Sequence, residues 1–330
     1  MEKLTSILVV VDPRHEMYRT LGKALMLARK FGARLELFLC DSQRAFVLKH
    51  SYVTQEVERA WRESACRAHP QDAMTSSLHT DDLEKAREIA VADSLKYMQA
   101  LKDSLNASDV DISIDVACHS PLYESIVHKV RETSTDLVIK TAAGRHPMRR
   151  LSLDENDWHL ARACPATLML TGDHKWSEEP RFAAAVDVSE NNSCSLARMI
   201  AHTADYLAAQ CHAELDLLYS EPKQADFARH VARRETLRQL ASEHGVTAEH
   251  THVLQGDAED TLAKFAAGQH YDVLVLGALT RRRGVAALVG SLTSQLVDTL
   301  DCDFVLVKPA NFEQREAEDP PPDLRPDSSH

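Results

Sequence analysis

One pattern occurs twice in this chain and limits its possible folds more than any other feature. A near-continuous apolar run that closes in an aspartate opens each half: SILVVVD, ending at Asp12, and RFAAAVD, ending at Asp187. Such runs are typical of parallel strands that are buried on both faces. The length of 330 residues also fits two domains of ordinary size. We therefore expect an internal duplication.

The same order of segments follows each apolar run. Further strands are predicted at 33–40, 112–118, 136–140 and 165–171 in the first half, and at 213–219, 248–254, 272–277 and 303–309 in the second. Helices are predicted at 22–31 and 122–133, and at 195–210 and 258–268. Strands that alternate with helices through short connections form parallel βαβ units. We expect two tandem flavodoxin-like or Rossmann-like α/β domains, each a five-stranded parallel sheet with helices on both faces, rather than one continuous mixed sheet.

The domain limits follow from composition. We expect a first domain at 1–173, a second at 174–311, and a disordered acidic, proline-rich tail at 312–330, with a polar linker at 172–180. The first domain carries a long helix-prone insertion at about 41–107, with apolar residues at three- and four-residue spacing. Within it, residues 69–81 are expected to form the most mobile loop.

Charge and composition exclude several classes of function. A net charge of -12 argues against nucleic acid or an anionic membrane as the main partner. The seven cysteines lack CxxC spacing, and pairs such as His250 and His252 lack further ligands, so no disulfide framework and no metal site are predicted. The apolar run at the N-terminus is too short to span a bilayer, and it has no signal-peptide cleavage site, so we expect a cytoplasmic protein.

The chemistry is concentrated after the fourth strand of the second half. Gly277-Ala-Leu-Thr280 is followed by nine residues and then by Gly290-Ser291, which opens a helix. Gly277 leaves the carboxyl end of a parallel strand, where open α/β sheets place their ligands. Free backbone amides and the positive end of the helix dipole at Gly290-Ser291 suit a phosphate. Three neighbouring side chains, Arg281, Arg282 and Arg283, add positive charge.

This loop resembles the motif of the universal stress protein family, in which Gly, two residues, Gly, nine residues and Gly-Ser or Gly-Thr bind ATP. VIKTAAGRH, DWHLARACPATLML and the length of the insertion resemble the tandem, E-type members. The resemblance implies a nucleotide site formed by Asp187, Gly277, Thr280, Gly290 and Ser291, with Asp187 near the nucleoside. It also implies that the fifth strands pair, so that the two copies form an internal pseudo-dimer; further dimerisation is left open.

Two departures from the motif shape the expected function. Thr280 replaces a glycine, and a β-branched residue at positive φ costs roughly 1–2 kcal/mol, so weakened binding is expected. In the first half, Asp154 and Glu155 stand where Gly290 and Ser291 stand in the second, and two acids would repel an anion. We therefore expect the first half to bind no nucleotide.

The predicted function is a stress-response binding and regulatory module with ATP or a related nucleotide in the second domain. The chain shows no Walker lysine, general base or metal-binding acid pair, so at most slow ATP hydrolysis is expected and no catalytic residue is assigned. The alternatives are a non-nucleotide scaffold with a vestigial site and a binder of an apolar ligand. In the simplest alternative, the glycines serve only tight packing and Asp187 only caps a helix.

Overall fold

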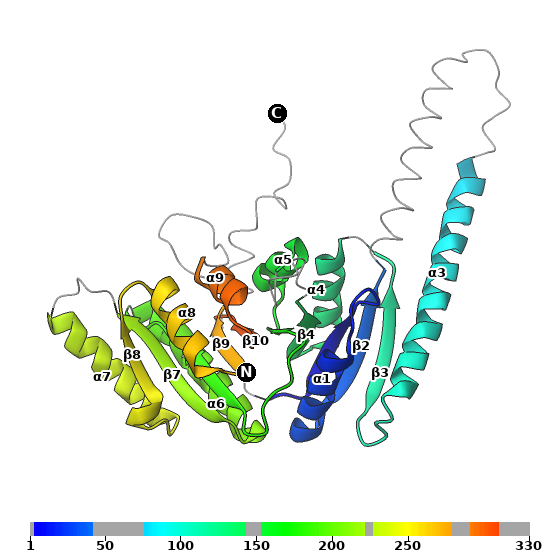
Figure 1. Cartoon of the computed structure of the whole chain (residues 1–330). Coiled ribbons are helices and arrows are strands. Elements are labelled where there is room, and N and C mark those ends of the chain that lie inside the picture. The colour runs from blue at the N-terminus through cyan, green and yellow to red at the C-terminus, as the bar shows by residue number, and fades with distance from the viewer. Residues whose placement is uncertain are drawn as a thin grey trace, which may run out of the picture.

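The computed structural model of the chain is an elongated α/β molecule built on one central sheet (Figure 1). The structure describes residues 3–41, 76–119, 121–142, 153–189, 191–221, 227–278 and 291–309. The predicted acidic tail, 312–330, lies outside these ranges. Among the described residues, no helix combines the length and the apolar composition that crossing a bilayer requires.

The first half alternates strands and helices as the sequence predicts. Its elements are β1 (Ser6–Val11), α1 (Tyr18–Phe31), β2 (Arg34–Cys40), α3 (Ser76–Ser104), β3 (Ile112–Ala117), α4 (Leu122–Thr133), β4 (Leu137–Thr141), α5 (Glu155–Ala163) and β5 (Thr167–Thr171). The predicted helix at 122–133 is present with those bounds, whereas α1 begins four residues before the predicted start at Gly22. Gly22 lies inside α1 and has open space around its Cα.

The second half repeats this order. Its elements are β6 (Arg181–Ala185), α6 (Asn191–Cys211), β7 (Glu214–Glu221), α7 (Phe227–Glu243), the 3-10 turn η2 (Ala248–His250), β8 (Thr251–Gln255), α8 (Ala258–Gln269), β9 (Val273–Gly277), α9 (Ser291–Thr299) and β10 (Asp303–Val307). The third strand begins at Thr251 and not at Ala248, because η2 occupies the first three residues of the predicted strand.

The ten strands form a single sheet in the order β3-β2-β1-β4-β5-β10-β9-β6-β7-β8. Within each half all neighbours are parallel, and the two halves share one strand order. The halves meet where β5 and β10 pair antiparallel, with Val305 opposite Met169. Each half is the expected five-stranded parallel sheet, and the expected pairing of the fifth strands is confirmed. This pairing covers the two open edges and joins the halves into one continuous mixed sheet, which was not expected.

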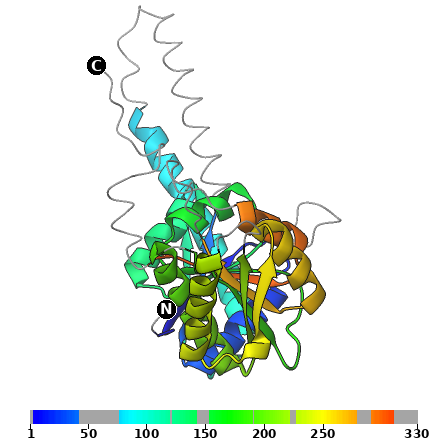
Figure 2. The ribbon, with the colours of Figure 1, turned by 90° about the vertical axis from the view of Figure 1, so that its left-hand side faces the viewer.

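Helices cover both faces of the sheet, as Figure 2 shows from the β8 edge. One apolar layer packs α1, α3, α6 and α7 on the sheet, and the other packs α4, α5, α8 and α9. Alternate residues of the buried strands serve the two layers: Val9 belongs to the first layer, and Leu8 and Val10 to the second. This two-sided burial explains why the strands are apolar runs rather than alternating ones.

A buried ion pair locks the two halves together beside the β5–β10 contact. Lys23 of α1 donates to Asp303 of β10 at 2.9 Å, and both side chains are buried. Asp303 also accepts hydrogen bonds from the Gly172 amide at 2.9 Å and from Trp176 Nε1 at 2.7 Å. The linker therefore packs into the joint through the same carboxylate that pairs with α1.

The described part of the insertion is one long helix. α3 runs from Ser76 to Ser104 along the β3 edge (Figure 1). Its Met98 side chain is fully buried in the apolar layer. Residues 76–81 were expected to belong to a mobile loop, but the structure places them in the first turns of α3. SSLHTDD contains neither Gly nor Pro, so nothing in it prevents a helix. Residues 42–75 lie outside the described ranges.

Candidate functional site

The carboxyl ends of β6 and β9 bring the described members of the predicted site to one edge of the second half. β6 and β9 are neighbours, so Asp187, two residues beyond β6, and Gly277, the last residue of β9, lie at the same edge. α9 begins at Ser291, the residue at which the motif opens a helix. Thr280, Arg281, Arg282, Arg283 and Gly290 fall within 279–290, outside the described residues.

Gly277 is placed where α6 crosses the end of β9. A Cβ atom added at Gly277 would stand 3.0 Å from Leu196 Cδ2 and 3.6 Å from Ile200 Cδ1, both on α6. Close packing alone therefore accounts for glycine at this position, and the ligand role of Gly277 rests on its backbone. The equivalent residue of the first half is Thr141, whose hydroxyl bonds to that of Thr20 on α1 at 2.7 Å.

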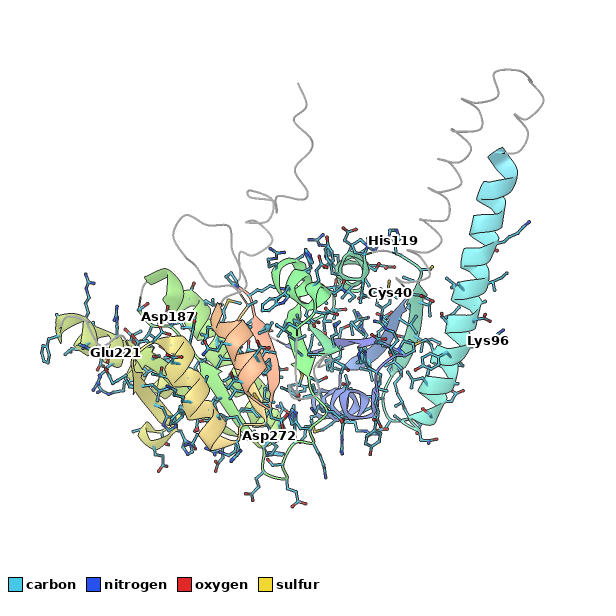
Figure 3. All side chains as sticks on the ribbon, turned by 45° about the horizontal axis from the view of Figure 1, so that its top comes forward. Cys40, Lys96, His119, Asp187, Glu221 and Asp272 are labelled. Atoms are coloured by element: carbon cyan, nitrogen blue, oxygen red, sulfur yellow. The ribbon has the colours of Figure 1, made fainter. Side chains whose placement is uncertain are left out.

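Asp187 is an exposed carboxylate at this edge (Figure 3). It accepts one hydrogen bond from the described residues, from the Ser189 amide at 2.9 Å. This contact closes a local turn and leaves further acceptor positions on the two oxygens. The alternative of a helix cap is not supported, because α6 begins at Asn191 and the Asp187 bond goes to a residue before it.

Asp12, the equivalent acid of the first half, is already occupied. Arg14 donates to it from the backbone amide at 3.0 Å, from Nε at 2.8 Å and from Nη2 at 2.6 Å. His15 Nδ1 lies 3.1 Å from Asp12 Oδ2, the oxygen that also accepts from Arg14 Nη2. Burial acts to raise the pKa of Asp12, but the bonds and charges of Arg14 and His15 outweigh it and lower the pKa to about 2. An internal cation thus fills the place that a ligand hydroxyl would take.

The helices that follow the fourth strands, α5 after β4 and α9 after β9, also differ in whether the protein's own side chains occupy their N-termini. The Asp154 side chain caps α5 by accepting from the Asp157 amide at 2.8 Å, and Asp157 accepts in turn from the Asp154 amide at 2.9 Å. Lys140, in β4, lies 2.6 Å from Asp157 Oδ1, and the Asp157 side chain is buried. The positive end of the α5 dipole is therefore neutralised by the chain's own carboxylates.

The first turn of α9 carries no acidic residue. Its amides have no intrahelical acceptors, as at any helix start, and the helix dipole adds partial positive charge. Such a helix end can bind an anion through backbone donors. Among the described residues, the two halves thus present one helix N-terminus that is already occupied and one that lacks an acid.

A polar cluster beside this edge is not predicted from the sequence. Glu221, at the end of β7, is buried, and its carboxylate meets His230 Nδ1 at 2.5 Å, Arg234 Nη2 at 3.6 Å and Gln255 Nε2 at 3.1 Å. Burial would raise the pKa of Glu221, but these three partners lower it. Figure 3 shows Glu221 near Asp187. The signal that could have found the cluster is the run of basic residues on the N-terminal half of α7.

A second cluster lies at the opposite, amino-terminal edge. Asp216 is buried and accepts from Tyr271 Oη at 2.5 Å, His250 Nδ1 at 2.6 Å and Arg181 Nη2 at 3.2 Å, with His252 Nε2 at 3.4 Å. The sequence shows His250 and His252 only as a close pair without further ligands, and the structure brings both to one carboxylate because β7 and β8 are paired. This cluster is far from Asp187 in the strand direction, near the labelled Asp272 end of the sheet (Figure 3).

The described part of this edge contains a carboxylate and a helix start. Within the described ranges, no group of three or more His, Cys, Asp or Glu side chains is arranged to hold a metal ion. The carboxylate of Asp187 follows β6, and the N-terminus of α9 at Ser291 follows the neighbouring strand β9 in the chain. These groups suit a ligand that is anionic at one end and rich in hydroxyls at the other.

Comparisons with known proteins agree with the duplication. The model of the "Universal stress protein family" matches residues 3–171 and 181–308. Universal stress protein E of Escherichia coli K12 is 25% identical over 332 residues, covering 95% of this chain and 96% of its own length. A universal stress protein E homolog of Haemophilus influenzae is 22% identical over 329 residues, covering 93% and 98%.

Solved structures show the same fold. A protein of unknown function from Pseudomonas aeruginosa PAO1 has a TM-score of 0.70 at 22% identity, covering 96% of this chain and 97% of its own. A universal stress protein from Archaeoglobus fulgidus has a TM-score of 0.63 at 11% identity, covering 92% and 98%. Both likenesses extend over the two halves and over the joint between them.

Proposed function

The chain belongs to the universal stress protein family as a member with two Usp domains in tandem, and from this we propose that it is a stress-response regulatory protein whose second domain binds a nucleotide. The ligand is ATP or a related nucleotide, and the first domain binds none. The nucleotide sets the state of the protein, and any hydrolysis is slow. The sequence, as noted above, offers no general base or metal-binding acid pair for fast turnover.

The observation that best supports this proposal is the contrast between the two helix starts. In the first domain, Asp154 and Asp157 cap α5 and Lys140 pairs with Asp157. In the second, α9 begins at Ser291 without an acid in its first turn. An anion placed at α9 meets free amides, whereas an anion placed at α5 meets two carboxylates.

The residues take the following roles in this proposal. The amides of Gly290 and Ser291 hold a phosphate, and the backbone after Gly277 passes beside it. Thr280 borders the phosphates and weakens binding, while Arg281, Arg282 and Arg283 supply charge close to them. Asp187, whose carboxylate has free acceptor capacity among the described residues, accepts from the ribose hydroxyls.

Calorimetric titration of the full chain with ATP tests the proposal. Gly290→Asp should abolish binding, because the new carboxylate would stand against the anion at the start of α9, while circular dichroism and the melting temperature stay near the wild type. The matched change in the first domain, Asp154→Asn, should leave nucleotide affinity unchanged. Loss of binding in Asp154→Asn, or full binding in Gly290→Asp, would show that the site has been placed in the wrong domain.

A further inference from the structure

α7 presents an exposed stripe of apolar and basic side chains. Its four members follow one another at three- and four-residue spacing, which places them on one side of the helix: Phe227, Val231, Arg234 and Arg238. Phe227 is 80% exposed and Val231 is 54% exposed. More than half of each arginine side chain is exposed as well. We call these four residues the α7 stripe.

The α7 stripe faces away from the elements on which α7 packs. Leu237 and Leu240 bury one side of the helix in the apolar layer. Another side, with Thr236 and Glu243, lies beside α6, and Glu243 is 3.8 Å from Arg198 there. At about 100° per residue, the stripe lies roughly opposite this second side. Figure 1 shows α7 at one end of the molecule, so the stripe faces outward.

The charges of α7 favour an acidic partner. Acidic side chains stabilise the first turn of a helix and basic ones the last turn, yet α7 has no acid in its first turn and no base in its last. Arg234 lies 3.6 Å from Glu221, and Arg238 pairs with Glu235. A guanidinium has five N–H donors, so each arginine can bind a further carboxylate. The positive end of the helix dipole adds to this attraction.

The same chain contains a segment of matching chemistry. Six acids lie in its last part, in the company of two arginines: Glu313, Glu316, Glu318, Asp319, Asp323 and Asp327. Leu324 stands between the last two acids and provides an apolar side chain. The match of the family model ends at residue 308, so this acidic segment lies beyond the matched Usp domain.

The acidic segment is long enough to reach the α7 stripe. β10 ends at Val307 on the carboxyl edge of the second half, and α7 begins at the same edge, after β7. Three strand spacings separate β10 from β7, which is roughly 15 Å. Residues 310–330 can span up to roughly 70 Å when extended. The direct path crosses the ends of β9 and β6, where Gly277 and Asp187 lie.

We propose that the α7 stripe docks the acidic segment 313–327 of the same chain. The carboxylates of the segment bind the two arginines of the stripe, and Leu324 packs on Phe227 and Val231. The docked segment passes the candidate nucleotide site, where its negative charge repels a phosphate and weakens nucleotide binding. This effect on the nucleotide rests on the proposed function, whereas the docking does not.

Disulfide formation in the full chain tests the docking. Val231→Cys combined with Leu324→Cys should close an intramolecular disulfide in a glutathione buffer, with peptide mapping to identify the bond. Ala232→Cys with Leu324→Cys is the matched pair, because Ala232 is exposed in the same turn but lies outside the stripe. The first pair should close about fivefold faster. Arg238→Gln should slow it roughly two- to fivefold, and Arg229→Gln, exposed on another side of α7, should not.

Calorimetric titration of the full chain with ATP tests the effect on the nucleotide. Replacing Asp319, Asp323 and Asp327 together by Asn should strengthen ATP binding about threefold and abolish the preference of the disulfide for residue 231. Equal ATP affinity in this variant and the wild type would refute the effect on the nucleotide.

Three results would overturn the docking: equal closure of both cysteine pairs, no effect of Arg238→Gln, or a disulfide that joins two chains. The last of these would assign the α7 stripe to a second copy of the protein. If no variant and no wild-type protein binds ATP, the proposed function fails, while preferential closure at residue 231 would still confirm the docking.

Discussion

Asp12 and Asp187 occupy equivalent positions, each just beyond the first strand of its half, yet their surroundings differ. Arg14 follows Asp12 by two residues and turns back on it with both side-chain and backbone donors. Ser189 follows Asp187 by two residues as well, but it donates only its backbone amide. The residue two positions after the aspartate therefore decides whether the carboxylate is bound by a side chain of the protein or can accept a hydrogen bond from a ligand.

The pH dependence of stability should report the Asp12 contacts. The pKa of Asp12 falls from 3.8 to about 2 in the folded chain. This shift stabilises the fold fully above pH 3.8, and the contribution is lost as the pH falls toward 2. Since Arg14 is largely exposed, the contribution is about 1 kcal/mol rather than the full value of the shift. Urea denaturation should therefore show that Asp12→Asn costs this amount at pH 7 and progressively less below pH 4; an equal cost at both would contradict it.

Thr280→Gly should strengthen nucleotide binding. If the loop places residue 280 at positive φ beside the phosphates, the threonine costs roughly 1–2 kcal/mol, and glycine relieves it. The expected gain in affinity is about tenfold by calorimetric titration. Thr280→Ser, which restores neither the small size nor the backbone freedom of glycine, is the control. If wild type binds nothing and Thr280→Gly binds, the natural site is vestigial and the scaffold alternative is right.

For single residues, the sequence predicts the position of those that lie at the end of a predicted strand. Asp187 and Gly277 could be placed at the sheet edge because each follows an apolar run directly. The contact of His230 with Glu221 could not be predicted, since the two residues belong to different elements and a basic residue on a helix usually faces solvent. The contacts of Asp216 with His250 and His252 were missed for the same reason: they depend on the β7–β8 register.

At the scale of elements, the β5–β10 contact is held by side chains as well as by the strand ladder. Lys23 reaches from α1 to Asp303, and Lys308, one residue after β10, donates to the Leu160 carbonyl of α5 at 3.2 Å. Both lysines are buried, and each crosses from one half to the other. The joint is therefore a packed, charged core and not a flexible hinge.

Asp303→Leu should destabilise the whole chain strongly. It would leave the Lys23 charge buried without its partner and remove the acceptor for Gly172 and Trp176. Breaking one side of a buried pair typically costs about 3–5 kcal/mol. Asp109→Leu, which breaks the exposed pair with Arg29, should cost less than about 1 kcal/mol. Similar losses for both variants in urea denaturation would contradict a buried lock.

Element types were predicted better than element limits. The strands and most of the helices follow from apolar runs and helical spacing, but α7, η2 and the first turns of α1 and α3 were missed. Their limits depend on local capping and on packing against the sheet, neither of which has a strong signal in the apolar pattern. The pairing of β5 with β10 was expected from the family resemblance and not from the apolar pattern, because it joins two segments more than 130 residues apart.

At the scale of the whole molecule, duplication and divergence have produced one sheet whose two halves differ at their carboxyl edges. The family, the strand order and the covered faces are common to both halves. Among the described residues, the differences lie at the carboxyl edge. Arg14 binds Asp12 and Asp154 caps α5 in the first half, whereas Asp187 accepts only from the Ser189 amide and the first turn of α9 has no acid. Because β5 and β10 complete each other, separated halves would expose an open strand edge, so binding has to be measured on the intact chain.

Native mass spectrometry of the intact chain, purified from cells without added ligand, would show whether the second domain holds a nucleotide. We expect at most one nucleotide per chain, with partial occupancy if Thr280 weakens binding, and none in Gly290→Asp purified in the same way. Asp154→Asn should retain the single nucleotide. Two nucleotides per chain, a lipid-like mass in place of a nucleotide, or a nucleotide that persists in Gly290→Asp would contradict this expectation.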